Sequence, residues 1–423
     1  MTEYRPRLVD STLELWLKTF DAVSLEGPRW TGKTMTCEQF AASAVYLSRR
    51  PSDQFDPLEM AKLNPSFLFE GAKPRLIDEW QLMSEIWDMV RGDIDANHGA
   101  KGMYLLTGSS LPPQFDSRRK DAVRHSGTGR IGRLRLSTMT LYETGDSSGE
   151  VSILSLFRGE DIQGSVRGIS LDEITHFIVR GGWPANLEGQ DSSIMPRAYI
   201  EDLISQDLES IDADLDGRRF RRLLLSLARN ESTLCPSSRL AADAGNGRPL
   251  DDSTVRKYLS VLDHLYLICD QEAFSPSFRS RTRLRIAPKR HLADPSLAAA
   301  IVGADEVSLK SDLQYLGFLF ESLVEHDLRV YIEHLGGRLS HYQDYENCEV
   351  DAVLSLPDGN YGLVEIKLGA HHTILDEAAG NLLRVSRKLE KEASFLAIVS
   401  GLAPIPMKRK DGVYVIPLTS LKP

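Results

Sequence analysis

The sequence predicts an α/β protein of several domains, with a parallel sheet in its N-terminal part and a second, mixed sheet near its C-terminus. Three observations support this fold class. The chain has 423 residues, more than one ordinary domain contains. Short apolar runs at 21–25, 75–78 and 103–107 alternate with helical stretches, a pattern typical of parallel strands joined by crossover helices. Further along, two apolar runs flank a Pro-Asp-Gly-Asn turn at 357–360, which predicts a hairpin.

The composition is that of a globular protein with ordinary cores. Hydrophobic residues make up 42% and charged residues 26% of the chain, and the net charge is −10, so contact with nucleic acid requires a local basic patch. The four cysteines form no C-x-x-C pair, which argues against a zinc ribbon or a disulfide framework. We find no apolar signal segment at the start and no run of ~18 apolar residues. We therefore expect a cytoplasmic protein without membrane contact.

The strand at 21–25 leads directly into a glycine-bearing loop, "EGPRWTGKT" at 26–34. Its two glycines, followed by Lys33 and Thr34, fit the pattern G-x-x-x-x-G-K-[ST] without mismatch. Such glycines let backbone amides curl around phosphate oxygens, and the start of the following helix adds the positive end of its dipole. The motif therefore predicts a P-loop that binds ATP and ADP. The residues expected to contact the nucleotide here are Gly27, Pro28, Arg29, Trp30, Thr31, Gly32, Lys33 and Thr34.

Within this loop, Lys33 would reach the β- and γ-phosphates, and Thr34 would ligate Mg²⁺. A phosphate-binding loop also needs a metal-holding acid on a neighbouring strand, and "RLIDEW" supplies Asp78 and Glu79. Asp78 would bind Mg²⁺ through water, and Glu79 would orient and deprotonate the attacking water. A solvated acidic turn is the alternative, and the loop upstream makes it the less favoured one.

Two further segments carry polar residues suited to the terminal phosphate. The third strand ends in "YLLTGSS", where Thr107 and Ser109 would read the γ-phosphate or would only form a strand-ending turn. The stretch 117–135 holds seven Arg or Lys residues and one Asp. Within it, Arg133 is a candidate for the arginine that one subunit supplies to its neighbour's nucleotide, and Arg130 is a second candidate. That role implies a homo-oligomer, and a solvated basic loop is the alternative.

Within the middle region, 166–285, residues 171–270 are predicted to be mostly helical. An amphipathic helix at 251–268 follows a shorter helix that ends at Gly245, and such a pair suggests a helix-turn-helix or winged-helix module. After it, "RSRTRLRIAPKR" at 279–290 has arginines at alternate positions, as a basic wing that tracks phosphates would. The residues expected to contact nucleic acid, DNA in preference to RNA, are Arg279, Arg281, Arg283, Arg285 and Arg256. The alternative is that the module joins subunits and its arginines pair with acids.

The C-terminal region, 286–423, contains a second candidate site. Asp351, Glu365 and Lys367 have the spacing D-x13-E-x-K of a PD-(D/E)xK nuclease core, although the Pro-Asp pair is missing. Glu365 and Lys367 leave the same face of one strand, and the hairpin brings Asp351 beside them. The two carboxylates, with Glu321 from the preceding helix, would hold Mg²⁺, and Lys367 would steady the attacking hydroxide. The alternatives are a chance E-x-K and a nuclease-like fold that binds without cutting.

The chain resembles a family of prokaryotic AAA+ ATPases in six stretches: "EGPRWTGKT", "RLIDEW", "LLTGSS", "HSGTGRIGRLRLSTMTLYETG", "RGGWPA" and "HLADPSLAAA". The resemblance implies an AAA+-like ATPase domain at 1–165, a helical and winged-helix domain at 166–285 and a restriction-endonuclease-like domain at 286–423. We therefore predict an ATP-hydrolysing protein that acts on nucleic acid and carries a candidate Mg²⁺-dependent nuclease domain. The alternative is a signalling or scaffold switch whose C-terminal domain only binds.

Overall fold

The computed structural model describes most of the chain and divides it into two units. Unit 1 comprises Met1–Thr138 and Leu262–Leu267, and unit 2 comprises Met139–Val261 and Ile268–Pro423. The predicted domain boundaries after 165 and 285 both fall inside unit 2 and stay predictions. The described residues are 4–48, 56–97, 99–110, 128–162, 164–165, 168–188, 191–207, 216–245, 247–275, 286–346 and 348–423.

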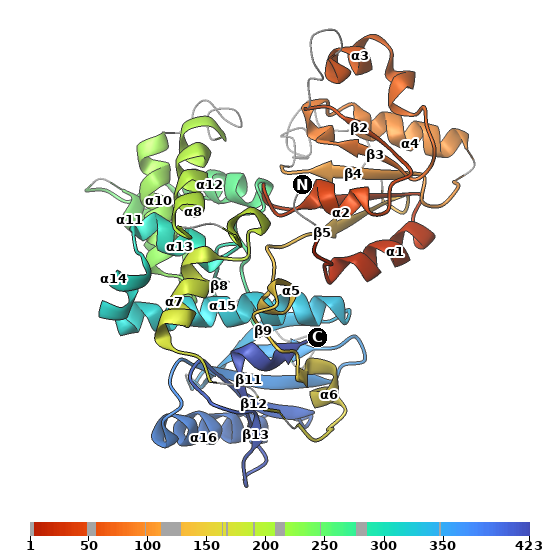
Figure 1. Ribbon diagram of the computed structural model, residues 1–423. Helices are drawn as coiled ribbons and strands as arrows, with labels where there is room; N and C mark the ends of the chain where they lie inside the picture. The colour runs from red at the N-terminus through yellow and green to blue at the C-terminus, as the bar shows by residue number, and fades with distance from the viewer. Residues whose placement is uncertain are drawn as a thin grey trace. The chain divides into compact units, whose positions relative to one another are not determined.

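Unit 1 is built on a five-stranded sheet with the order β2-β3-β4-β1-β5 (Figure 1). All four neighbouring pairs run parallel, which confirms the predicted parallel sheet. The predicted strands at 21–25, 75–78 and 103–107 are confirmed as β1, β3 and β4. The bounds of the strands are β1 (Ala22–Glu26), β2 (Ser43–Tyr46), β3 (Arg75–Asp78), β4 (Tyr104–Gly108) and β5 (Ile131–Arg135).

Helices cover both faces of this sheet, and successive side chains of a strand enter opposite cores. On β4, Leu105 packs in one core with Leu13 of α1, whereas Tyr104 and Leu106 pack in the other with Trp87 of α4. Strands buried on both faces read as apolar runs, which is why β1 and β4 were predictable, whereas β3 offers only two apolar residues. The helices of this unit are α1 (Val9–Thr19), α2 (Lys33–Glu38), α3 (Pro57–Leu63) and α4 (Ile86–Ala96).

Unit 2 contains a six-stranded mixed sheet with the order β13-β14-β12-β11-β10-β9 (Figure 1). Strands β9, β10 and β11 are antiparallel neighbours, which confirms the predicted hairpin, and β11, β12 and β14 run parallel. Helix α16 packs on this sheet through Leu375, Leu382 and Val385, and α15 contacts β9, β10 and β11. The bounds are α15 (Leu313–His334), β9 (Arg338–Gln343), β10 (Glu349–Ser355), β11 (Tyr361–Lys367), α16 (His372–Lys388), β12 (Phe395–Ser400), β13 (Met407–Lys408) and β14 (Tyr414–Pro417).

The remaining elements between β5 and α15 are mainly helical, as the periodicity predicts. The helix predicted at 251–268 is α12, and the helix predicted to end at Gly245 is α11. The helices are α5 (Leu141–Thr144), α6 (Ile153–Phe157), α7 (Leu171–Arg180), α8 (Ile194–Asp202), α10 (Gly217–Arg229), α11 (Ser237–Ala244), α12 (Asp252–His264), α13 (Pro295–Val302) and α14 (Glu306–Ser311). Two short pairs, β6 (Val151–Ser152) with β15 (Leu421–Lys422) and β7 (Thr233–Leu234) with β8 (Lys289–Arg290), complete the strands. Across the described ranges, no helix combines the length and apolar character needed to cross a bilayer.

Candidate functional site

The glycine-bearing loop connects the end of β1 to the start of α2, and both motif glycines are required by its geometry. Gly32 has a φ of 93°, in the left-handed region that glycine adopts without steric cost. At Gly27, an added Cβ would lie 2.2 Å from the carbonyl oxygen of Leu136, so no larger residue fits there. Of the other loop residues, Thr31 is buried and donates its hydroxyl to the carbonyl of Pro28 (2.9 Å). The neighbouring Arg29 and Trp30 are exposed.

Lys33 folds back over this loop. Its Nζ donates to the carbonyl oxygens of Gly27 (2.9 Å) and Pro28 (2.6 Å). Burial lowers the pKa of Lys33 to about 8, against the opposing effect of the Glu79 and Asp78 carboxylates. An ammonium group held inside a loop of backbone amides is suited to an anionic ligand such as a phosphate.

Asp78 brings three predicted motifs together at one carboxylate oxygen. Its Oδ1 accepts hydrogen bonds from the hydroxyl of Thr34 (2.6 Å) and from the hydroxyl of Thr107 (2.7 Å). Thr34 belongs to the loop, Asp78 ends β3, and Thr107 lies at the end of β4. Hydroxyl and carboxylate oxygens are ligands that Mg²⁺ takes in proteins, so the Thr34–Asp78 pair fits the predicted ion.

Glu79 lies in a strained backbone conformation, with a φ of 60°. Its backbone N–H donates to Thr107 Oγ1 (3.1 Å), and its carboxylate accepts from Ser109 Oγ (3.2 Å) and from the amide of Gln81. The amide of Gln81 also donates to Ser109 (3.1 Å). Strain of this kind concentrates at active sites. Thr107 and Ser109 therefore hold the two acids, and their contact with a γ-phosphate stays a prediction.

Two contacts at this site were not predicted. Gln81 lies two residues after Glu79, and this short spacing could have indicated that its amide contacts the Glu79 carboxylate. Arg7 is buried, and its guanidinium donates to the carbonyl oxygens of Thr31 (2.8 Å) and Ser137 (2.8 Å). It ties the loop to the segment that follows β5. No motif pointed to Arg7, because both of its acceptors are backbone groups.

The structure does not bring Arg130 to the loop. Residues 131–135 of the predicted basic segment form β5, which runs parallel to β1. Arg130 therefore lies at the amino edge of the sheet, where it pairs with Asp21 (3.3 Å), whereas the loop follows the carboxyl end of β1. Arg133 lies within β5, and its Nε is 3.1 Å from Glu26 Oε1. Arg133 thus contacts an acid of its own chain, and its role across subunits stays a prediction.

Three family models match successive parts of the chain. Residues 19–145 match an AAA domain, residues 171–308 a domain of unknown function (DUF8612), and residues 316–421 a domain of unknown function (DUF4143). Comparison with curated proteins gave no match. The first range contains the loop, Asp78 and Glu79 on a parallel sheet, which defines a P-loop nucleotide-binding class. Residues 19–145 are an AAA-type ATPase domain.

Several solved structures resemble the chain loosely. The Walker-type ATPase PABY2304 of Pyrococcus abyssi is 14% identical over 69% of this chain and 94% of that chain, with a TM-score of 0.41. The ORC1 protein of Aeropyrum pernix, solved in complex with DNA, is 14% identical over 71% and 93%, with a TM-score of 0.26. The FIGL-1 AAA domain, solved with ADP, is 18% identical over 60% and 83%, with a TM-score of 0.24. TM-scores below 0.5 are too low for these likenesses to bear on function.

In unit 2, the hairpin brings Asp351, Glu365 and Lys367 together. The Nζ of Lys367 lies 3.2 Å from Asp351 Oδ2 and 2.7 Å from Glu365 Oε2. Burial and the charge of Asp351 raise the pKa of Glu365 to about 8, and Asn381 donates to its Oε1 (2.7 Å). Burial opposes ionisation of Asp351 as well, but the charges of Lys367 and Lys289 hold its pKa below the ordinary value.

Lys289, which was not predicted here, adds a second ammonium group. Its side chain is buried and forms ion pairs with Glu321 and with Glu325 Oε1 (2.7 Å), and its Nζ lies 3.5 Å from the backbone oxygen of Asp351. Burial raises the pKa of Glu321 to about 7, against the opposing charge of Lys289. The acid predicted as a third metal ligand is therefore bound to a lysine. We call Lys289, Glu321, Glu325, Asp351, Glu365 and Lys367 the C-terminal charge cluster.

The predicted metal site of the C-terminal region does not fit this arrangement. Lys289 and Lys367 hold the carboxylates of Glu321, Asp351 and Glu365. Among the described residues, these three acids are not a group whose ligand atoms lie within 4.8 Å of one another. We therefore derive no chemistry through a metal ion at the C-terminal charge cluster.

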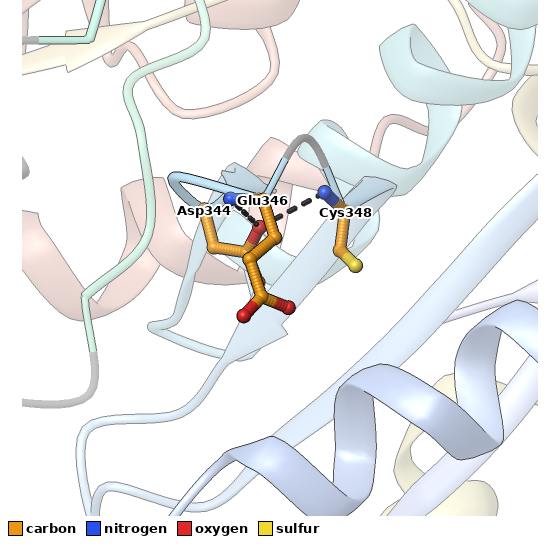
Figure 2. Close-up of side chains that lie close together, drawn as sticks. All are labelled: Asp344, Glu346 and Cys348. Carbon is orange, nitrogen blue, oxygen red and sulfur yellow. Dashed lines mark hydrogen bonds between the residues drawn. The ribbon is translucent and has the colours of Figure 1, made fainter.

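A different group, Asp344, Glu346 and Cys348, meets that spacing (Figure 2). Figure 2 shows one oxygen of Asp344 accepting from the backbone N–H groups of Glu346 and Cys348. Both hydrogen bonds are 2.9 Å long. The Nζ of Lys388 lies 2.8 Å from Asp344 Oδ2, 2.6 Å from Glu346 Oε2 and 3.1 Å from Cys348 Sγ. A lysine already acts as the cation of this turn.

The predicted nucleic-acid surface is described only in part. Arg256 is exposed on α12, where it pairs with Asp252 one helical turn away (2.8 Å). Lys289 and Arg290, which end the predicted basic stretch, are buried and paired with acids. The alternating arginines Arg279, Arg281, Arg283 and Arg285 lie outside the described residues.

Proposed function

We propose that the chain binds ATP with Mg²⁺ and hydrolyses it at the loop of its AAA-type domain. The observation that carries this proposal is the junction at Asp78 Oδ1, which accepts the hydroxyls of both Thr34 and Thr107. This junction joins the loop to the ends of two neighbouring parallel strands. Polar groups gathered at that edge of a parallel sheet are typical of a nucleotide site.

In this mechanism, Lys33 neutralises the oxygens of the β- and γ-phosphates. Thr34 and Asp78 hold Mg²⁺, which when bound offsets charge on the phosphates. Glu79 orients a water molecule and takes its proton, and the contacts from Ser109 and Gln81 keep its carboxylate in place. Arg133 supplies a positive charge to a neighbouring subunit in a homo-oligomer.

We further propose that nucleic acid, DNA in preference to RNA, is the target of this ATPase. The order α10, β7, α11, α12, with β7 paired to β8, supports a winged-helix module. The exposed Arg256 on α12 supports a phosphate-binding face, which Arg279, Arg281, Arg283 and Arg285 would extend.

For the C-terminal domain, we propose a restriction-endonuclease-like fold that binds without cutting. The order α15, β9, β10, β11, α16, β12, which sets Asp351 beside Glu365, supports that fold. Cleavage is not part of the proposal, because Lys289 and Lys367 neutralise the acids that would hold a metal ion. The same observation favours a second candidate function, a nucleotide-dependent signalling or scaffold switch.

The test is the rate of ATP turnover by purified protein alone, with duplex DNA and with RNA. We expect turnover to be lost in Lys33→Ala and to rise when DNA is added to the wild type. Turnover of Lys33→Ala at the wild-type rate would refute the ATPase proposal. A wild-type rate of ATP turnover that neither DNA nor RNA changes would favour the signalling or scaffold switch.

A further inference from the structure

Glu26 places a carboxylate directly before the phosphate-binding loop. It is the last residue of β1, it is only 6% exposed, and Gly27 follows it. Ser24 Oγ donates to its Oε1 (3.0 Å), and Arg133 Nε lies 3.1 Å from the same oxygen. Burying a carboxylate raises the free energy of the folded state unless hydrogen-bond donors hold it. The donors to Glu26 therefore determine whether the end of β1 is stable.

Tyr266 supplies the donor for the other oxygen. Its hydroxyl donates to Glu26 Oε2 (2.8 Å), and its own carbonyl accepts from Arg135 (3.0 Å). The guanidinium of Arg135 also lies over the Tyr266 ring, 5.7 Å from its centroid. Burial and the neighbouring Glu26 charge raise the pKa of the phenol, so it keeps its proton and remains a donor. Tyr266 is therefore anchored to both strands β1 and β5.

The segment that carries Tyr266 joins unit 1 from a distant part of the chain. Leu262–Leu267 belongs to unit 1, whereas the residues on both sides of this segment belong to unit 2. Tyr266 has a φ of 59°, a left-handed conformation that is strained for a tyrosine. Strained residues persist where surrounding contacts enforce them, and they cluster at switches and ligand sites.

We propose that Tyr266 is a positioning residue for the phosphate-binding loop, and that through Glu26 the segment Leu262–Leu267 responds to bound nucleotide. The proposal rests on the ATP-binding function above. Glu26 adjoins Gly27, so phosphates that order the loop also fix the carboxylate that Tyr266 holds. By linkage, the coupling is reciprocal. If bound nucleotide stabilises the hydrogen bond between Tyr266 and Glu26, this hydrogen bond strengthens nucleotide binding by the same factor.

The test compares Tyr266→Phe with Tyr258→Phe. Tyr258 lies on α12, which ends two residues before Tyr266, and it donates its hydroxyl to the carbonyl of Asp216 (3.0 Å), so the control loses a similar hydrogen bond away from Glu26. Two quantities are measured: the affinity for a fluorescent ADP, and the hydrogen exchange of residues 262–267 with and without ADP. We expect ADP to slow exchange in the wild type and in Tyr258→Phe. In Tyr266→Phe this response is lost, and affinity falls by about fivefold to tenfold, as for the net contribution of one ordinary hydrogen bond.

A Tyr266→Phe protein with wild-type affinity and the full ADP response would overturn the proposal, provided that Lys33→Ala has lost ADP binding. If Lys33→Ala binds ADP as the wild type does, the proposed function itself fails. Should Tyr266→Phe not fold, Glu26→Ala decides, because it removes the oxygen that accepts from the phenol. A lost ADP response in Glu26→Ala supports the link, and a retained response overturns it.

Discussion

Burial of the Lys33 ammonium makes nucleotide binding dependent on pH. Its pKa is lowered to about 8, so the free protein loses this charge progressively above pH 8. Bound phosphate oxygens favour the charged form and raise the pKa in the complex. Affinity for ATP should therefore be constant below pH 8 and should fall above it, by about tenfold per pH unit at most. Titration calorimetry between pH 7 and pH 9.5 measures this, with proton uptake on binding above pH 8. Constant affinity across that range would contradict this account of Lys33.

Lys289 is the buried cation on which the stability of the C-terminal charge cluster depends. In Lys289→Met, Glu321 and Glu325 lose their shared cation while they remain buried. We expect the free energy of unfolding of unit 2, measured in urea, to fall by about 3–5 kcal/mol, as when one partner of a buried ion pair is removed. Adding Glu325→Gln should restore part of the loss, because it removes one uncompensated carboxylate.

The control for this change is Lys388→Met, since Lys388 neutralises the turn of Asp344 and Glu346 near the surface. Its effect on unfolding should be much smaller. An equal effect of the two substitutions would show that burial of Lys289 does not matter. Binding of Mn²⁺ by the wild type that disappears in Glu365→Gln would show that the cluster takes a metal ion after all.

At the scale of elements, the close contact between the loop and the segment after β5 predicts opposite effects for two glycines of unit 1. A Cβ at Gly27 would lie 2.2 Å from Leu136 O, whereas a Cβ at Gly92 in α4 meets nothing within 4 Å. Gly27→Ala should abolish ADP binding because the loop must shift. Gly92→Ala should keep binding and raise the free energy of unfolding by about 0.5–1 kcal/mol, since alanine suits a helix interior. Normal ADP binding by Gly27→Ala would contradict the described loop geometry.

The composition of each strand in unit 1 determines whether the sequence could predict it. Strands β1 and β4 are largely apolar runs buried on both faces, so their composition indicates strands, whereas β3 has only Leu76 and Ile77 between two charged residues. Strand β5 was not predicted, because Arg133 and Arg135 follow Gly132 and interrupt its apolar residues. A Cβ at Gly132 would lie 2.7 Å from the ring of Phe20. Aromatic side chains from outside the strand supply the apolar surface there, and no local pattern in β5 reveals them.

At the scale of the whole molecule, local motifs predicted the P-loop, its two acids and the hairpin of unit 2. They did not predict Tyr266 beside Glu26, or Lys289 beside Glu321, because these partners are distant in sequence and no spacing rule joins them. The metal site predicted at Glu321 took no account of Lys289, which pairs with this acid. A motif supplies the acids, but only the folded chain determines which cation neutralises them.

In the proposed site, Glu79 acts in hydrolysis, whereas the loop binds ATP without it. The most direct test measures ATP affinity and ATP turnover for Glu79→Gln beside the wild type. We predict unchanged affinity and a turnover reduced by at least about 100-fold, the effect of losing a general base. Wild-type turnover in Glu79→Gln, or loss of ATP binding together with turnover, would contradict the proposed site.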